Sequence, residues 1–222
     1  MIDFARVRRM MVDHQLRTYD ITDLGVLSAM NEVPREVFAP EHAQELAYSD
    51  QSLPVAAGEA GQRYLLPPMI FGRILQNLQL RAGGRALVVA SGLGYEAAVM
   101  NRLGASVTVV EPDAAIASTM REKLAGAGAG GVEVVIGPFE EGCPDKAPFD
   151  VIYVNGAAQK RPQGLLEQLK DDGRLGIIMG DGSRTSRATL FVRSGDVFGA
   201  RAIFDAAAPL LAPFREEPGF VF

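Results

Sequence analysis

Apolar residues recur at two different spacings along the 222-residue chain. Up to about residue 66 they fall three or four positions apart, as at Phe4, Val7 and Met11, which is the period of one face of a helix. We therefore expect residues 1–66 to form an N-terminal helical cap. Within this cap the stretch 53–61, rich in Pro, Gly and Ala, is predicted to be a loop laid over another part of the molecule.

Short strand-type runs alternate with helical runs over residues 67–222, which predicts an α/β fold with a mostly parallel sheet flanked by helices. Strands are expected at 85–90, 106–111, 132–136, 150–155 and 174–179, and helices at 69–80, 95–103, 113–124 and 163–169. Two later runs, at 188–193 and 200–204, are typical of a hairpin that closes the sheet. We expect 1–66 and 67–222 to form one compact unit.

The segment 87–95 joins a buried strand to a helix through a glycine-rich turn. Gly92 and Gly94 lack a Cβ atom, so the backbone can turn tightly and approach a ligand at the carboxyl end of the strand. Glu111 ends the next strand, where a carboxylate can accept hydrogen bonds from the ribose of an adenosine moiety. The structural alternative is a simple tight turn, with Glu111 capping the following helix.

Two kinds of nucleoside cofactor fit this pattern. Residues 92–97 also match G-x-G-x-x-A, the signature of a nicotinamide dinucleotide site. However, the sequence gives no sign of a second mononucleotide-binding half, and neither His14 nor His42 follows the sheet, where a hydride-transfer acid is expected. The pattern therefore favours S-adenosylmethionine.

Composition excludes several other classes of protein. With 22 basic and 27 acidic side chains the net charge is -5, which gives no electrostatic reason to bind nucleic acid or a lipid surface. The apolar runs are far shorter than the ~20 residues of a membrane span. The single cysteine and the spacing of His, Asp and Glu indicate no metal site. We expect a cytoplasmic protein, and a monomer.

The chain resembles the protein-L-isoaspartate O-methyltransferase family, whose members methylate the abnormal carboxylate of isoaspartyl residues in damaged proteins. The matching segments, in order, are 9–16, 33–40, 47–50 with 53–54, 92–99, Glu111, 147–150, and 168–169 before Gly173. The resemblance implies a Rossmann-like S-adenosylmethionine-dependent methyltransferase fold with an N-terminal helical addition.

The same resemblance implies where the cofactor and the acceptor bind. It assigns cofactor binding to Ser91, Gly92, Gly94, Tyr95, Glu111 and Pro138. It further implies that S-adenosyl-L-homocysteine is the product, and that the partner is a protein or peptide carrying an isoaspartyl carboxylate.

Several positions depart from the family pattern. Val88 stands where the family has an acid that holds the methionine end of the cofactor, and Ala90 stands where it has glycine. The family's Gly-Asp-Gly, whose aspartate reaches the adenine, reads Gly137-Pro138-Phe139 here. The family's serine beside the substrate carboxylate corresponds to Leu66, which leaves Tyr64 as the nearby hydroxyl. Tyr64 and the Leu66 position are therefore the candidate catalytic positions.

The resemblance predicts an O-methyltransferase that acts on an isoaspartyl carboxylate. The departures at Val88, Pro138 and Leu66 leave an alternative, a non-catalytic relative that binds proteins or peptides. A dinucleotide-dependent oxidoreductase is a minor third possibility. Arg63 and Arg73 could pair with an anionic acceptor, although lone arginines are most often solvated.

Overall fold

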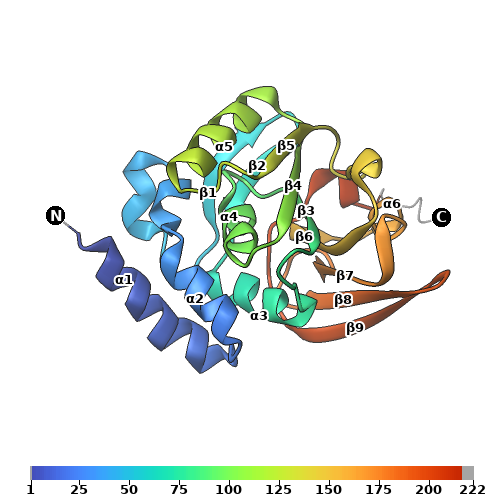
Figure 1. Ribbon diagram of the computed structural model, residues 1–222, viewed down its shortest axis with the longest axis horizontal. Coiled ribbons are helices and arrows are strands. Elements are labelled where there is room, and N and C mark those ends of the chain that lie inside the picture. Colours follow the sequence, from blue (N-terminus) through green and yellow to red (C-terminus); the bar gives the residue numbers. More distant parts are fainter. Residues whose placement is uncertain (1, 217–222) are drawn as a thin grey trace, which may run out of the picture.

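The centre of the molecule is a seven-stranded sheet with the strand order β5-β4-β3-β6-β7-β8-β9 (Figure 1). This computed structural model describes residues 2–216. The strands β3 to β7 pair in parallel, whereas β8 and β9 add to the edge in antiparallel fashion. Their bounds are β3 (Arg85–Val89), β4 (Ser106–Glu111), β5 (Glu133–Ile136), β6 (Phe149–Ala158), β7 (Leu169–Met179), β8 (Arg187–Ser194) and β9 (Val197–Asp205).

The helices that alternate with these strands also lie where the sequence predicts them. They are α3 (Pro68–Leu78), α4 (Tyr95–Arg102), α5 (Ala114–Gly126) and α6 (Gln163–Leu166). The predicted 163–169 helix is shorter than expected because β7 already begins at Leu169. The α/β fold and the late hairpin are confirmed.

Apolar residues on both faces of β3 explain why this strand has no alternation of apolar and polar residues. Ala86 and Val88 belong to one buried cluster, and Leu87 and Val89 belong to a second cluster on the other face. Helices α3, α4 and α5 contribute their apolar side chains to the first cluster. Helix α6 and the segment 211–214 cover the second. Both faces are therefore dry, as a parallel sheet requires.

Helical segments make up most of residues 4–46, as expected. Helix α1 (Phe4–Met11) continues into a π-helical turn, and α2 (Leu24–Glu32) packs against α3 and α4. The Asp23 carboxylate caps α2 by accepting a hydrogen bond of 3.0 Å from the Val26 amide. Among residues 2–216, no helix has the length and hydropathy needed to cross a bilayer.

The expectation that 53–61 is a loop is wrong, because this stretch forms a hairpin with the residues that follow. Strand β1 (Leu53–Gly58) pairs antiparallel with β2 (Gly61–Leu65), and Gly61 takes the left-handed φ of +96° that the tight turn requires. Inward and outward positions alternate, with Leu53 and Val55 of β1 and Arg63 and Leu65 of β2 facing inward. The Pro, Gly and Ala content hid this alternation.

Helix α3 packs closely against the sheet at Gly176 of β7. A Cβ atom built at this glycine would lie 2.4 Å from Cγ2 of Ile74, in a fully buried region. Gly176→Ala should therefore lower the free energy of unfolding by about 1–3 kcal/mol, the usual range for overpacking. Gly126→Ala, at the end of α5 with open space around its Cβ position, is the matched control and should be nearly neutral. Urea unfolding measures both, and equal effects would contradict the close approach.

Candidate functional site

The carboxyl ends of β3, β4 and β6 meet at the switch point of the sheet, where β4 and β5 lie on one side of β3 and β6 and β7 lie on the other. Ligands of open α/β sheets bind in the crevice at such a point. The glycine turn follows β3, Glu111 ends β4, and Asn155 lies near the end of β6. The structure thus brings the glycine turn and the predicted ribose-binding acid to one edge.

The glycine turn has the backbone conformation that the sequence predicts. Gly92 and Gly94 have φ values of +60° and +103°, in the left-handed region that favours glycine. Ala90 has φ +61°, although it carries a Cβ atom. A Cβ atom on Gly94 would lie 3.0 Å from Met120 of α5. The positive φ and the close packing against α5 therefore favour glycine at this second position without any ligand.

Glu111 is paired with an arginine of the hairpin. Nε and Nη2 of Arg63 donate to Oε2 and Oε1 of Glu111 at 2.9 and 2.6 Å, so that the guanidinium engages both carboxylate oxygens. The Asp113 amide also donates to Oε1, at 3.0 Å. The Arg63 side chain is 1% exposed and that of Glu111 is 0% exposed. The pair is shielded from water, unlike an ion pair on the surface.

The rest of the Arg63 guanidinium is equally well satisfied. Its Nη1 donates to the Gly61 carbonyl at 2.7 Å, and its Cζ lies 4.7 Å from the centre of the buried Phe139 ring. The expectation of a solvated arginine, or one that pairs with an anionic acceptor, is therefore wrong for Arg63. This role cannot be predicted from the sequence, because the contact between residues 63 and 111 depends on a hairpin whose sequence is typical of a loop.

Asn155 is a second residue that the sequence analysis missed. Its Nδ2 donates to the carbonyl of Tyr64 at 2.8 Å and to that of Ala90 at 3.3 Å, while its Oδ1 accepts from the Tyr153 hydroxyl at 3.0 Å. The side chain thereby ties β2 to the end of β3. The sequence does contain a signal for this role, because Asn155 is a polar residue at the end of the predicted strand 150–155.

The arrangement does not fit the nucleoside of the family's cofactor. Both oxygens of Glu111 already accept hydrogen bonds from Arg63. Ser91 is 1% exposed and donates to Oε2 of Glu96 at 2.8 Å. The hairpin covers the glycine turn, since a Cβ atom on Gly92 would lie 2.9 Å from Cγ2 of Val55. Arg63 thus engages the predicted ribose-binding acid, Glu111, and the hairpin covers the surface of the glycine turn.

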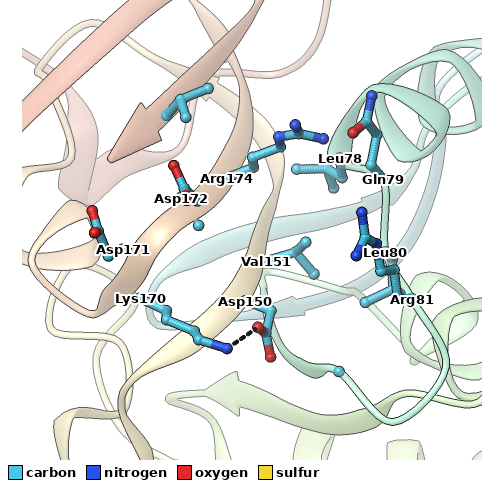
Figure 2. A pocket seen from close by; sticks show the side chains of 13 residues that line it. Leu78, Gln79, Leu80, Arg81, Asp150, Val151, Lys170, Asp171, Asp172 and Arg174 are labelled. Atoms are coloured by element: carbon cyan, nitrogen blue, oxygen red, sulfur yellow. Dashed lines mark hydrogen bonds and ion pairs between the residues drawn. The ribbon is translucent and has the colours of Figure 1, made fainter. Parts of the chain in front are cut away.

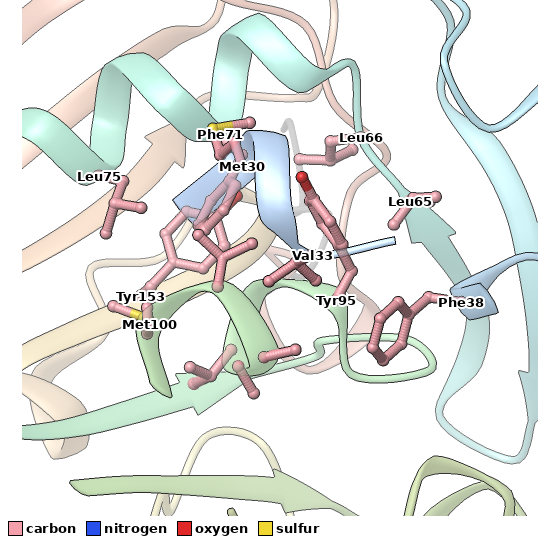
Figure 3. Packing of buried hydrophobic residues seen from close by; sticks show 14 of the residues in the cluster. Met30, Val33, Phe38, Leu65, Leu66, Phe71, Leu75, Tyr95, Met100 and Tyr153 are labelled. Atoms are coloured by element: carbon pink, nitrogen blue, oxygen red, sulfur yellow. The ribbon is translucent and has the colours of Figure 1, made fainter. Parts of the chain in front are cut away.

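The other predicted site residues lie apart from this crevice or turn away from it. The Tyr95 ring is fully buried and packs edge-on against Phe38 and Phe71, with ring centres 5.9 and 6.0 Å away (Figure 3). Leu66 lies in the same cluster and is 1% exposed. Any contact between Tyr95 and a ligand at the glycine turn would therefore involve its backbone.

Tyr64 and Pro138 are more accessible. Tyr64 is half-buried on β2, and Pro138 is exposed just after β5. Arg35 connects two other segments of the cap, because its Nε donates to the Ala47 carbonyl at 2.5 Å and its Nη2 donates to the Leu66 carbonyl. The backbone around Leu66 is therefore fixed by a fully buried arginine.

A hollow of about 500 Å³ lies at the opposite end of the strands from the glycine turn, around the amino ends of β3, β6 and β7 (Figure 2). Its charges largely neutralise one another, as in the 3.1 Å pair between Lys170 and Asp150. Within residues 2–216, the His, Cys, Asp and Glu side chains form no group of three that could hold a metal ion. The residues that line the hollow thus include neither the glycine turn nor Glu111.

The buried Glu96 gives the region a measurable pH dependence. Burial raises the pKa of Glu96 to about 7, and the hydrogen bond from Ser91 and the charge of Arg35 offset only part of this rise. Between pH 4.5 and 7 the unfolded chain loses a proton that the folded chain keeps, so wild-type stability should fall by up to about 3 kcal/mol over this range.

Glu96→Gln should remove this loss, and its advantage over the wild type should grow with pH. Urea unfolding at several pH values measures it, with the exposed Glu122→Gln as the control. Parallel profiles for the wild type and Glu96→Gln would contradict the raised pKa.

Comparisons with known proteins bear on this site. The family model described as protein-L-isoaspartate (D-aspartate) O-methyltransferase matches residues 7–202. A protein-L-isoaspartate O-methyltransferase of Methanoculleus marisnigri is 38% identical over 192 residues, which cover 86% of either chain. That of Methylorubrum extorquens is 39% identical over 199 residues, covering 90% of this chain and 85% of the relative.

Solved structures agree with these relatives. A protein-L-isoaspartate O-methyltransferase superposes with a TM-score of 0.80 at 25% identity, over 91% of this chain and 65% of the other. A Plasmodium falciparum protein described in the same terms, in complex with S-adenosyl-L-homocysteine, has a TM-score of 0.76 at 19% identity, over 92% of this chain and 97% of that one. It supports the fold. The resemblance noted in the sequence is confirmed, and the chain belongs to the protein-L-isoaspartate O-methyltransferase family.

Proposed function

We propose that this chain is an S-adenosylmethionine-dependent methyltransferase that esterifies the carboxylate of isoaspartyl residues in damaged proteins or peptides. The match to the family model over residues 7–202 carries this proposal. The position of the glycine turn and Glu111 agrees with it, because both lie at the switch point where open α/β sheets bind ligands, although Arg63 engages both oxygens of Glu111 in this structure. The cytoplasmic location, the monomeric state and the division at residue 66 stay predictions.

The lack of an evident general base is compatible with this reaction. An aspartate-like carboxyl group has a pKa near 4, so the acceptor is already ionised at neutral pH and no side chain has to remove a proton. What the chain has to provide is alignment of the reacting groups, which can lower a barrier by roughly 7–11 kcal/mol. The loss of a hydroxyl at Leu66 therefore affects how the acceptor is positioned, and the missing acid at Val88 affects how the cofactor is held.

The acceptor half of the proposal can be tested with matched substrates. An isoaspartyl peptide should form a methyl ester in the presence of S-adenosylmethionine, whereas the same peptide with an ordinary aspartate should not. Mass spectrometry of the peptide measures the ester. If neither peptide is methylated while the chain binds S-adenosyl-L-homocysteine, the acceptor is wrong. If the isoaspartyl peptide binds without turnover, the chain is a non-catalytic relative.

Tyr64 is our candidate for the hydroxyl that faces the acceptor. It is half-buried on β2, two residues before Leu66. Tyr64→Phe should raise KM for the isoaspartyl peptide about tenfold, which corresponds to one hydrogen bond of about 1.4 kcal/mol. Tyr19→Phe, at a tyrosine that is 43% exposed and lies outside the crevice, is the control. Steady-state kinetics compares the two, and an unchanged KM in Tyr64→Phe would exclude this role.

A further inference from the structure

We infer that Arg63 is an internal occupant of the nucleoside site, and that an adenosyl ligand binds to this chain only when the Arg63–Glu111 pair separates. The inference rests on the proposed function, in that it concerns the same cofactor site. Nε and Nη2 of Arg63 take the positions on Glu111 that two ribose hydroxyls would otherwise take. A ligand and Arg63 therefore compete for one carboxylate.

Arg63 holds this carboxylate more strongly than a ribose can. The guanidinium is a charged donor with a planar fork that matches a carboxylate, and such charge-assisted bonds are roughly twice as strong as neutral ones. Ribose hydroxyls are neutral donors. Exchange of one for the other would also leave the charge of Glu111, which is 0% exposed, without its counter-charge. The pair therefore wins the competition unless the rest of the ligand contributes enough binding energy.

The hairpin holds Arg63 in this position from several directions. Asn155 binds the Tyr64 carbonyl at 2.8 Å, directly beside Arg63 in β2. The Gly61 carbonyl accepts from Nη1 of Arg63, and the Phe139 ring lies against the guanidinium. The guanidinium consequently has no unsatisfied group that would favour rotation into water. Release of Glu111 requires movement of Arg63 together with at least part of β2.

The same contacts explain why Arg63 differs from Arg73, the other arginine that the sequence offers as a partner for an anionic acceptor. Arg73 also stacks on an aromatic ring, with Cζ 4.1 Å from the centre of Phe204. Its pair with Asp20 is 3.8 Å long, and the Asp20 side chain is 87% exposed. Arg73 thus has a similar aromatic contact without a buried carboxylate, which makes Arg73→Ala the matched control for Arg63→Ala.

Calorimetric titration with S-adenosyl-L-homocysteine tests the inference on the full chain. The wild type and Arg73→Ala should bind with the same weak affinity. Arg63→Ala should bind at least tenfold more tightly, equivalent to about 1.4 kcal/mol. Because Arg63→Ala leaves a buried charge unpaired, which disfavours folding, Arg63→Lys serves as a second variant. Lysine keeps a positive charge but lacks the planar fork that donates to both oxygens of Glu111. This variant should therefore also bind S-adenosyl-L-homocysteine more tightly than the wild type.

Two results would overturn the inference. The first is equal affinity for S-adenosyl-L-homocysteine in the wild type and in a folded Arg63 variant. The second is no binding to any folded variant, because something other than Arg63 would then exclude the ligand. The methyl ester assay separates this inference from the proposed function. If Arg63→Ala binds S-adenosyl-L-homocysteine more tightly but neither the wild type nor the variant forms the ester, the inference is supported and the proposed function is contradicted. If the wild type binds S-adenosyl-L-homocysteine tightly and forms the ester, the proposed function is supported and the inference is contradicted.

Discussion

A single buried ion pair determines how the carboxyl ends of the central strands are organised around the glycine turn. Glu111 is the acid that we predict to bind a ribose, and its charge is paired with that of Arg63, which lies in a distant part of the sequence. Removing one partner of such a pair typically costs about 3–5 kcal/mol, because the other charge stays buried. The hairpin, the glycine turn and the end of β4 are consequently held together as one structure.

This pair also relates the departures from the family pattern to one another. Phe139, in the segment that replaces Gly-Asp-Gly, provides the aromatic surface on which the Arg63 guanidinium lies. Val88 is fully buried in the apolar cluster on the face of the sheet that α3, α4 and α5 cover, so its position offers no charge to a ligand. The changes at residues 88 and 139, together with Arg63, thus favour an edge that is closed by the protein itself. Family membership and a crevice filled by side chains are compatible properties of this chain.

Much of the fold could be predicted from the sequence, and the reason is local. Strand β4 has the predicted bounds because Ser106–Glu111 is a short run of strand-forming residues that ends before a proline. The hairpin at residues 53–65 could not be recognised in the same way, since Pro54, Ala56 and Gly58 weaken the strand pattern. Glu111 and the glycines were found by their positions after strands. Arg63 was not, because its partner lies 48 residues away and only the tertiary structure brings them together.

Ala90 shows how a loop can keep its shape after its most suitable residue has gone. A left-handed backbone costs a residue with a Cβ atom roughly 1–2 kcal/mol, yet Ala90 adopts φ +61°. The surrounding contacts impose this conformation, since Asn155 holds the Ala90 carbonyl and the Gly94 amide donates to the Ser91 carbonyl at 2.9 Å. The path of the turn is therefore a property of the scaffold. A glycine-turn shape in a related protein of this fold is, by the same reasoning, evidence of common architecture before it is evidence of a bound nucleoside.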